Sequence, residues 1–262
     1  MTIPFDKFQA TGNDFIMIDQ REQQYLSRMD TEIIEKLCNR RFGIGADGLI
    51  LLQLAEDVDF EMIYFNADGR ESTLCGNGGR SIVKFAQGIG LINDECTFLA
   101  IDGIHHAIIN ENGDVELQMN QVTEVNVFDD HDTLDTGSPH YISFCDDIKS
   151  VNVVEEGAAI RYSDNFKKQG INVNFVQKNG TGIHVRTYER GVEGETLSCG
   201  TGVTAAAIAS SLNYNELPSE GIIDIHTLGG ELQVKYQREG DIFTNIWLCG
   251  PAKKVFKGVV YI

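Results

Sequence analysis

The chain has 262 residues, of which 42% are hydrophobic and 23% charged, the proportions of an ordinary soluble globular protein with one or two domains. Its formal net charge of -18 argues against the basic surface that binds nucleic acid by counterion release, so we expect no nucleic-acid partner. The first residues lack a basic stretch followed by an apolar core, and no apolar run approaches the ~20 residues that span a bilayer. We therefore expect a cytoplasmic protein with no membrane partner.

The first third of the chain predicts two strands with a helix between them. Apolar, strand-like runs occupy residues 15–18 and 60–65. The helix begins after Asp30, a good N-cap residue, carries its apolar side chains on one face, and ends at Gly43 as the C-cap.

Residues 43–48 match the GxGxxG pattern of dinucleotide-binding loops, but their context differs. Such a fingerprint follows a strand and opens a helix, whereas these residues follow the expected helix and lead into the apolar run LILLQLA. A turn between helix and strand is the better interpretation. The chain also contains no GxxxxGK[ST] loop, no HExxH and no CxxC, so we expect neither a cofactor nor a metal.

The segments CGNGGR at 75–80 and CGTGVT at 199–204 carry the same unusual cysteine-glycine element. Each follows a strand-like run and precedes a segment with helical character, at 79–88 in one half and 203–212 in the other. A glycine-rich turn at a helix start directs backbone N–H groups outward, and the helix macrodipole adds positive potential there. Each element therefore predicts an anion site beside a thiol whose thiolate form is stabilised.

The two elements belong to a repeat that runs along the chain. Cys75 and Cys199 are separated by 199 - 75 = 124 residues, and Tyr64 and Tyr188 share that offset. A hairpin pattern follows each element, around residues 112–113 in the first half and in ELQVKYQREGDIFTNIWL in the second. The sequence therefore predicts a duplicated α/β (α+β) fold with two pseudo-symmetric lobes, each a curved, mostly antiparallel sheet around a central helix.

Two equivalent thiols suit the inversion of a carbon centre. If the lobes face each other, Cys75 and Cys199 reach one shared cleft from opposite sides. Inversion by proton transfer needs a base on one face of the carbon and an acid on the other, and a thiolate and a thiol can exchange those roles. The two helix N-termini would hold the α-carboxylate and the charge that develops on it. A thiol-disulfide switch protein, from a different class, would use the same proximity of two cysteines.

Motifs along the whole chain resemble those of the diaminopimelate epimerase family. They are ATGNDF at 10–15, GIGADGL at 43–49, FNADG at 65–69, CGNGGR at 75–80, YERG at 188–191, GETLSCGTG at 194–202 and CGPA at 249–252. The related proline racemase family also carries paired cysteines, but its first motif typically has histidine where this chain has Asn77. A racemase acting on proline or another amino acid is therefore the nearest alternative.

The resemblance implies cofactor-independent epimerisation of LL-2,6-diaminopimelate to the meso form by thiolate and thiol proton transfer, in lysine and peptidoglycan precursor biosynthesis. It implies Cys75 and Cys199 as the catalytic pair, with His140 and Glu189 assisting them. The substrate-binding residues that it implies are Asn13, Asn66, Gly76, Asn77, Asn172, Glu189, Arg190, Gly200 and Thr201, with Arg190 facing the distal carboxylate. We expect a homodimer whose chain divides into one lobe of residues 1–117 with 252–262 and a second lobe of residues 118–251.

Two features depart from the family pattern. The family often reads GNPH where this chain has Gly137, Ser138, Pro139 and His140, so a shorter hydroxyl replaces an asparagine side chain. The familiar spacing ERGxGET is expanded by one residue to ERGVEGET, and the sequence assigns no role to this loop. The contact made at position 138 is therefore the one that the resemblance does not carry over.

Overall fold

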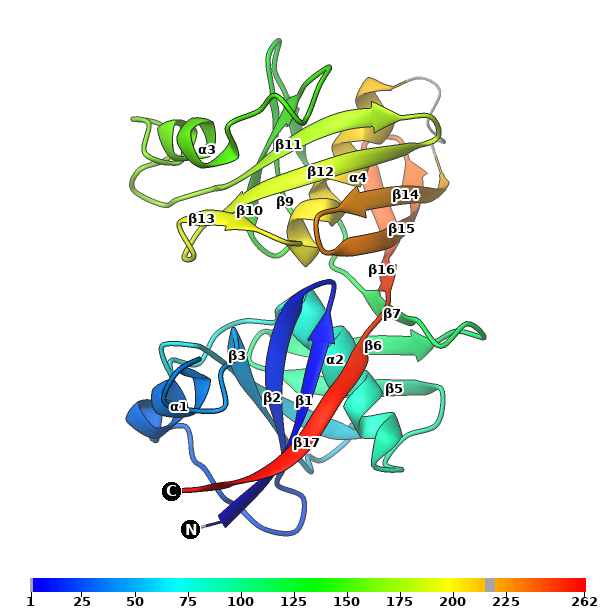
Figure 1. The fold of residues 1–262 in the computed structure, drawn as a ribbon. Coiled ribbons are helices and arrows are strands. Elements are labelled where there is room, and N and C mark those ends of the chain that lie inside the picture. Colours follow the sequence, from blue (N-terminus) through cyan, green and yellow to red (C-terminus); the bar gives the residue numbers. More distant parts are fainter. Residues whose placement is uncertain (1, 215–219) are drawn as a thin grey trace. The chain divides into compact units, whose positions relative to one another are not determined.

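The computed structural model describes residues 2–214 and 220–262, and the chain forms two compact units (Figure 1). The N-terminal unit comprises Met1–Leu117 and Gly250–Ile262, and the C-terminal unit comprises Gln118–Cys249. Each unit has its own buried core. Among the helices of the described residues, none has the length and apolar character that crossing a membrane requires.

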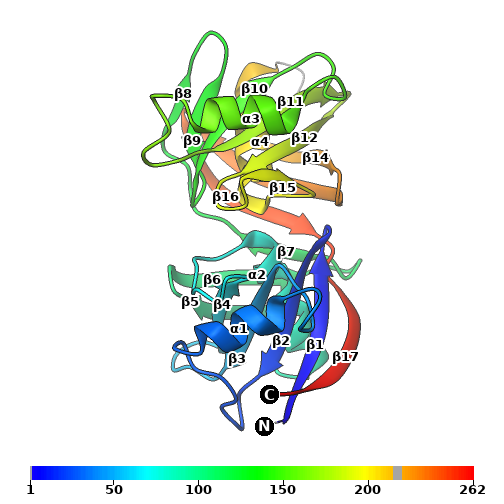
Figure 2. The same ribbon diagram turned by 60° about the vertical axis from the view of Figure 1, so that its left-hand side comes forward.

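The N-terminal unit is built on strands in the order β17-β1-β2-β3-β4-β5-β6-β7 (Figure 2). The β2–β3 and β4–β5 pairs are parallel and the other pairs are antiparallel. Its elements are β1 (Thr2–Ala10), β2 (Asn13–Asp19), α1 (Thr31–Cys38), β3 (Gly48–Gln53), β4 (Phe60–Asn66), α2 (Gly76–Gly88), β5 (Glu95–Ala100), β6 (Gly103–Ile109), β7 (Val115–Gln118) and β17 (Lys253–Tyr261).

The C-terminal unit is built on strands in the order β8-β9-β10-β11-β12-β14-β15-β16, with β13 paired to the end of β12. Here the β10–β11 and β12–β14 pairs are parallel. Its elements are β8 (Val125–Val127), β9 (Asp132–Asp135), β10 (Pro139–Phe144), α3 (Val153–Arg161), β11 (Asn172–Asn179), β12 (Gly182–Glu189), β13 (Gly194–Thr196), α4 (Gly200–Asn213), β14 (Gly221–Thr227), β15 (Gly230–Glu239) and β16 (Ile242–Gly250).

The two units repeat one pattern of strand pairing. From β1 to β7 the pairs are antiparallel, parallel, antiparallel, parallel, antiparallel and antiparallel, and from β9 to β16 the same succession recurs. In both units a long helix precedes the last three strands of this succession. It is α2 before β5, β6 and β7, and α4 before β14, β15 and β16. The predicted α/β (α+β) fold, with a mostly antiparallel sheet and a central helix in each half, is confirmed.

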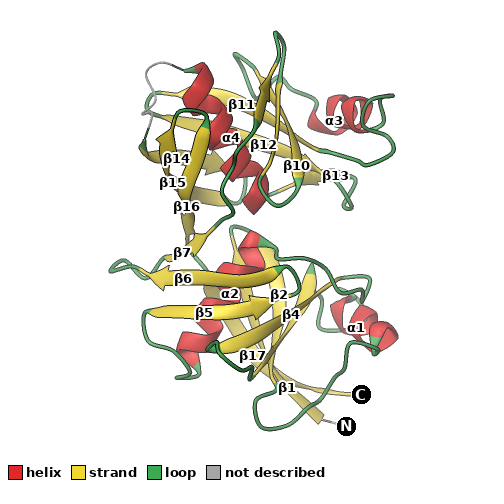
Figure 3. Ribbon diagram, turned by 180° about the vertical axis from the view of Figure 1, so that it is seen from behind, coloured by secondary structure: helices red, strands yellow, loops and turns green. Residues whose placement is uncertain are grey.

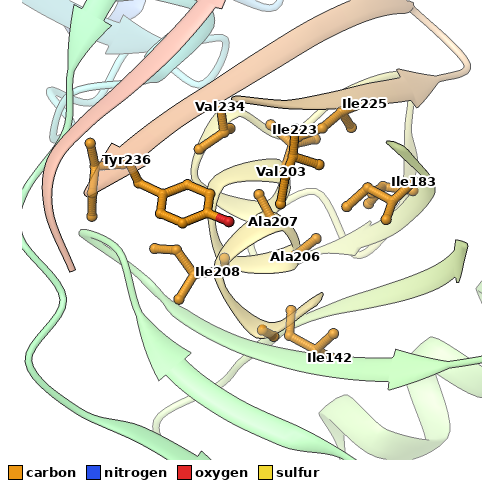
Figure 4. Packing of buried hydrophobic residues seen from close by; sticks show 14 of the residues in the cluster. Ile142, Ile183, Val203, Ala206, Ala207, Ile208, Ile223, Ile225, Val234 and Tyr236 are labelled. Atoms are coloured by element: carbon orange, nitrogen blue, oxygen red, sulfur yellow. The ribbon is translucent and has the colours of Figure 1, made fainter. Parts of the chain in front are cut away.

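The central helix of the C-terminal unit is buried on all sides, which explains its composition. Val203 and the alanines of α4 pack against side chains from β10, β12, β14 and β15, including Ile142, Ile183, Ile223 and Tyr236 (Figure 4). A helix that is surrounded by strands has no solvated face, so its sequence consists of small and apolar residues without a charge and is not amphipathic. Figure 3 shows α4 among the strands of the C-terminal unit.

The N-terminal sheet is covered on both faces. Leu49 and Leu51 of β3 belong to the buried cluster that includes Ile34 of α1, whereas Ile50 faces the N-terminus of α2, where its Cδ1 lies 3.2 Å from the position of a Cβ on Gly78. A strand that is buried on both faces reads as a continuous apolar run instead of alternating with polar residues. This is why LILLQLA lacks the periodicity of a surface strand.

The helix predicted after Asp30 is present, but its predicted end at Gly43 is wrong. α1 begins at Thr31 and ends at Cys38, with Asn39 in extended conformation as its C-cap. The chain then folds back, and the N–H groups of Ile44 and Gly45 donate to the carbonyl of Leu37 at 2.9 and 3.0 Å. The helix ends early because these backbone bonds from the following turn occupy a carbonyl of its last turn.

The GIGADG segment is the predicted turn between a helix and a strand. It connects α1 to β3, and Gly45 adopts φ +83°, a conformation that side chains with a Cβ rarely tolerate. At Gly43 a Cβ would lie 2.0 Å from the Lys36 carbonyl oxygen. The glycines thus serve a close approach of the turn to α1, and the dinucleotide reading stays excluded by the order of the elements.

Candidate active site

Cys75 and Cys199 occupy the same position in the two units, the N-cap of the central helix. Their backbone angles are φ -92°, ψ 122° and φ -110°, ψ 113°. The first helical hydrogen bond returns to the cysteine carbonyl in each case, from Gly79 N at 2.7 Å and from Val203 N at 2.9 Å. Because the first N–H groups of a helix have no acceptor within it, each thiol lies beside backbone donors at the positive end of a helix dipole.

The second glycine of each CGxG element is needed for close packing at the helix start. A Cβ on Gly202 would lie 2.4 Å from Oδ1 of Asn174 and 3.3 Å from Sγ of Cys199. A Cβ on Gly78 would lie 3.2 Å from Ile50 and 3.3 Å from Met62. The glycines therefore let buried neighbours approach each helix N-terminus, and they hold the cysteine against those neighbours.

In the N-terminal unit, β2 begins at Asn13, whose side chain contacts both the Cys75 thiol and Asn77 in the first turn of α2. Asn13 Oδ1 accepts a hydrogen bond from Nδ2 of Asn77 at 3.2 Å and from Sγ of Cys75 at 3.5 Å. Arg80, which is fully buried, donates from Nη2 to Oδ1 of Asn77 at 2.8 Å. The structure thus brings together four residues that the sequence singled out, Asn13, Cys75, Gly76 and Asn77.

Asn66 lies at the end of β4 in an exposed turn. Its Oδ1 accepts from the Tyr64 hydroxyl at 2.9 Å, and its backbone oxygen accepts from Gly69 N at 2.9 Å. Within the described residues it makes no hydrogen bond to Asn13, Cys75 or Asn77. Among the described residues, the hydrogen bonds of Asn66 therefore lie within its own turn and do not join it to the cysteine cluster.

In the C-terminal unit, β10 places His140 in the core, where Asn174 of β11 orients it. Nδ2 of Asn174 donates to the Tyr141 carbonyl at 3.1 Å and contacts Nδ1 of His140 at 3.1 Å, and Oδ1 of Asn174 accepts from the Thr187 hydroxyl at 2.9 Å. A carbonyl only accepts, so the amide nitrogen faces the imidazole and Nδ1 of His140 must be the acceptor. The proton of the neutral ring is therefore on Nε2, which has no hydrogen-bond partner within the described residues.

His140 is held in its neutral form. Burial, with a smaller contribution from the positive charge of Arg190, lowers the pKa of His140 from 6.5 to about 3. The imidazole therefore presents an N–H donor over the physiological range and carries no charge there.

The Arg190 guanidinium is held by Ser138, the residue at which this chain differs from the family pattern. Ser138 Oγ accepts from Nη2 of Arg190 at 3.2 Å and from Nδ2 of Asn172 at 2.9 Å, and Gln169 O accepts from Nη1 of Arg190 at 3.2 Å. Oδ1 of Asn172 accepts from the backbone N–H of Arg190 at 2.9 Å. The shorter serine side chain thus holds Arg190 in place, and the buried Asn172 fixes both its neighbours.

The second thiol lies against the β9–β10 turn. Thr136, just before that turn, donates from Oγ1 to the carbonyl of Thr201 at 2.9 Å. The Thr201 hydroxyl lies 3.6 Å from Sγ of Cys199, a residue with 6% of its surface exposed. Gly200 is buried beside them, so three residues predicted for the site, Cys199, Gly200 and Thr201, lie together at the N-terminus of α4.

The expanded loop after Arg190 is fastened by Glu193. This residue adopts φ +56°, and its carboxylate accepts from the hydroxyls of Tyr162 at 2.9 Å and Tyr188 at 3.2 Å and from Arg161 at 3.3 Å. Its N–H donates to the carbonyl of Glu189 at 2.9 Å. The expansion thus carries a carboxylate that ties the loop to the end of α3 and fixes the half-buried Glu189.

The C-terminal unit also contains a polar hollow of about 560 Å³. It is lined by the segment that contains Pro139 and His140, by Gln169 and Gly170 next to Arg190, and by the amide-bearing residues Asn120, Gln121, Asn126 and Asn165. A hollow of this size beside His140 leaves room for a small polar molecule.

The sequence analysis did not identify three residues that hold the predicted site residues in place, namely Asn174, Glu193 and Asp47. Asn174 carries a weak signal, since a polar residue in the apolar strand INVNF needs buried partners. Glu193 lies in the expanded loop, to which the sequence assigns no role. Asp47 lies in the GxGxxG-like segment, which predicts only a turn, but its Oδ2 accepts a hydrogen bond from Nδ2 of Asn13 at 2.8 Å.

Comparison with known proteins identifies the family. The family model described as "Diaminopimelate epimerase" matches residues 5–125 and 133–255. A diaminopimelate epimerase of Flavobacterium psychrophilum is 52% identical over 255 residues, which cover 97% of this chain and 98% of that protein.

Two solved structures share the fold at low sequence identity. A phenazine biosynthesis protein of the PhzF family from Bacillus anthracis matches with a TM-score of 0.80 at 16% identity, covering 100% of both chains. A probable proline racemase from Agrobacterium radiobacter K84 matches with a TM-score of 0.69 at 15% identity, covering 99% of this chain and 92% of that one. These likenesses establish the architecture only.

The structure shares with these proteins a duplicated α/β architecture, and in this chain each central helix has a cysteine N-cap. The match over nearly the whole length makes the assignment specific, and the chain belongs to the diaminopimelate epimerase family. The family resemblance read from the motifs is thereby confirmed.

The neutral state of His140 predicts a definite pH dependence of stability. Between pH 6.5 and about 3 the unfolded chain binds a proton at this residue that the folded chain does not, so stability is lost as the pH falls through this window. One such proton contributes up to about 1.4 kcal/mol per pH unit. His140→Asn, which keeps an acceptor for Asn174, should flatten the slope of unfolding free energy between pH 6 and 4 by about that amount.

The measurement is denaturant unfolding followed by the fluorescence of Trp247, the single tryptophan, which lies in the C-terminal unit. An unchanged slope in His140→Asn would contradict a neutral buried histidine.

Proposed function

We propose that this chain interconverts LL-2,6-diaminopimelate and meso-diaminopimelate by proton transfer at the α-carbon, in lysine and peptidoglycan precursor biosynthesis. The observation that carries the proposal is the recurrence of a cysteine N-cap, with matching backbone angles, at the start of both central helices. The names of relatives that cover the whole chain support the choice of substrate.

In the proposed reaction one thiolate removes the α-proton and the other thiol returns a proton to the opposite face. Cys75 and Cys199 exchange these roles when the direction reverses, which a pair of chemically equal groups allows. Charge that develops on the α-carboxylate is stabilised by the backbone N–H groups and helix dipoles beside the thiols, around Gly76 and Asn77 in one unit and Gly200 and Thr201 in the other. Because backbone donors perform this task, we propose that no cofactor takes part.

We propose that the remaining site residues bind and orient the substrate. Arg190 receives the distal carboxylate, since a planar guanidinium can bind both carboxylate oxygens, and Ser138 and Asn172 hold it for that purpose. Asn13, Asn66 and Glu189 complete the proposed set of contacts.

His140 and Glu189 are proposed to assist the two thiols. The neutral imidazole of His140 offers an Nε2–H donor from a buried position, and the backbone of Glu189 is fixed by the clamp that Glu193 makes.

Three further expectations remain part of the proposal. The lobes are taken as residues 1–117 with 252–262 and residues 118–251, and the protein as cytoplasmic. The chain is proposed to form a homodimer, because β17 and the residue after it expose large apolar side chains that a second copy could cover, namely Val255, Phe256, Val259, Tyr261 and Ile262.

Light scattering tests the homodimer. We expect twice the 29.0 kDa of one chain, and Phe256→Asp should reduce the mass toward a single chain. A wild-type protein that measures as a monomer at micromolar concentration would remove this part of the proposal.

The reaction itself is tested by hydrogen exchange in deuterated water. Incubation with LL-diaminopimelate should place deuterium at the α-carbon and produce the meso form. Cys75→Ser and Cys199→Ser should each lower kcat by about 10² to 10⁴, the range for loss of an acid or base. Cys145→Ser is the matched control, because that thiol only donates to the Val176 carbonyl at 3.6 Å and should tolerate the hydroxyl.

Retention of full activity in both site variants, or the absence of exchange in the wild type, would refute the proposal. Exchange with proline or another amino acid but not with diaminopimelate would favour the alternative racemase.

Ser138→Ala tests the binding role of Arg190. Losing the hydroxyl frees one side of the guanidinium, so KM for diaminopimelate should rise by about threefold to tenfold while kcat changes less. Ser150→Ala, in the same unit with its hydroxyl bonded only to the Asp147 carbonyl, is the control and should leave KM unchanged. Steady-state kinetics distinguish them, and equal KM values for the two variants would argue against this role.

A further inference from the structure

A chain of hydrogen bonds links the Cys75 thiol to the GIGADG turn, a motif that the proposed reaction does not otherwise use. Asn13 stands in the middle of this chain. Its Oδ1 accepts from Cys75 at 3.5 Å and from Asn77 at 3.2 Å, while its Nδ2 donates to Oδ2 of Asp47 at 2.8 Å. The turn therefore reaches the thiol through one intervening side chain.

Asp47 is itself held by a cluster of charged side chains. Arg40 donates to Oδ1 of Asp47 at 2.7 Å and to both carboxylate oxygens of Asp14, at 2.6 and 3.1 Å. The buried Lys7 donates to Asp14 at 2.6 Å. Although burial by itself raises it, hydrogen bonds from Arg40 and Lys7 hold the pKa of Asp14 at about 2, so Asp14 stays ionised at neutral pH and keeps Arg40 beside Asp47.

Charged groups at the two ends of the chain decide how both amides point. Arg80 can only donate, so Asn77 must turn its oxygen to Arg80 and its nitrogen to Asn13. A carboxylate can only accept, so Asn13 must turn its nitrogen to Asp47. Both constraints leave the oxygen of Asn13 facing Cys75.

An amide oxygen beside a thiol favours the protonated form. It accepts a hydrogen bond from S–H, whereas its lone pairs repel a thiolate, and a hydrogen bond made only to the neutral form disfavours ionisation. The amide thus opposes the effect of the α2 N-terminus. Charged and titratable groups around this thiol in the N-terminal unit are Arg80 on α2, the cluster of Lys7, Asp14, Arg40 and Asp47, and Asp102 with His105 on the segment that contacts Leu74.

We propose that Asp47 is a positioning residue for the reaction, which fixes the Asn13 carboxamide with its oxygen toward Cys75 and so keeps this thiol protonated until substrate binds. The proposal rests on the proposed function for its meaning, because the reaction needs one thiol and one thiolate. In this proposal the GIGADG turn, which belongs to the N-terminal unit, sets the difference in protonation between the two cysteines.

Asp47→Ala should release the Asn13 amide. It removes the acceptor for Nδ2 of Asn13, so Nδ2 of Asn77 alone holds the oxygen of Asn13 and the amide can turn its nitrogen toward the thiol. An N–H donor stabilises a thiolate, so the midpoint of the alkylation rate of Cys75 against pH should move lower by about one unit. Asp47→Asn removes the same charge but keeps an acceptor oxygen for Nδ2 of Asn13 and for the Asp14 N–H, and it is the matched control.

The readout is iodoacetamide labelling of the intact protein over a range of pH, quantified on the tryptic peptide of residues 71–80, which contains Cys75 as its only cysteine. We expect the midpoint for Asp47→Ala to lie below that for Asp47→Asn. We also expect kcat/KM to fall at least tenfold in Asp47→Ala. Asp57→Asn, an equal charge change at an exposed turn with φ +64° that asparagine accommodates, should alter neither quantity.

Equal midpoints for Asp47→Ala and Asp47→Asn would overturn the proposal, as would a higher midpoint for Asp47→Ala. Thermal melting establishes that each variant is folded. If Asp47→Ala does not fold, Arg40→Gln carries the test, because the exposed Arg40 orients Asp47, and kcat/KM should fall at least threefold; an unchanged kcat/KM would be decisive against it.

The labelling result does not depend on the identity of the substrate. A wild-type protein that exchanges no diaminopimelate proton would end the proposed function while the order of the midpoints remained as expected. Wild-type exchange together with equal midpoints would end the inference about Asp47 alone.

Discussion

The start of a buried helix is the constraint on which both cysteine clusters depend. A cysteine stands at the N-cap of α2 and of α4 with glycine at the fourth position of each element, where buried neighbours leave no room for a Cβ at Gly202 and little at Gly78. That packing fixes the sulfur relative to the backbone donors of the first turn. Burial on all sides also leaves α4 without a charged side chain, and the surrounding strands supply an apolar lining.

The two cysteines have similar backbone conformations, but different side chains surround their thiols. Cys75 faces an amide oxygen whose orientation is set by ionised groups at both ends of a chain, Arg80 and Asp47. Cys199 lies beside the Thr201 hydroxyl, which can donate or accept, with a hydrogen-bonded core behind it that contains Asn174 and the neutral His140. A duplicated fold thus supplies equivalent positions, while the divergence of the neighbours allows the two sulfurs to differ in proton affinity.

Much of this could be predicted from the sequence, because it depends on short-range patterns. Strand runs, the hairpins and the recurrence of CGxG at one offset gave the duplicated fold, and the motifs gave the family. The end of α1 was missed, since the carbonyl of Leu37 is taken by bonds from the later turn at Ile44 and Gly45, a contact that no local pattern encodes.

The hydrogen bonds that hold the site residues in place could not be predicted from the sequence either. Asn174, Asp47 and Glu193 act through partners more than ten residues away in sequence, such as Tyr162 for Glu193 and Asn13 for Asp47, so only the folded chain reveals them.

The return of β17 to β1 has a consequence for how the protein is made. Thr2 pairs with Tyr261 and Gln9 with Lys253, so β1 acquires this neighbour only after residues 253–261 are synthesised. The C-terminal unit, which is continuous in the chain, can finish folding earlier. Cys75 therefore belongs to a unit that closes last, and a nascent chain cut short near residue 250 would carry a complete second half beside an unfinished first one.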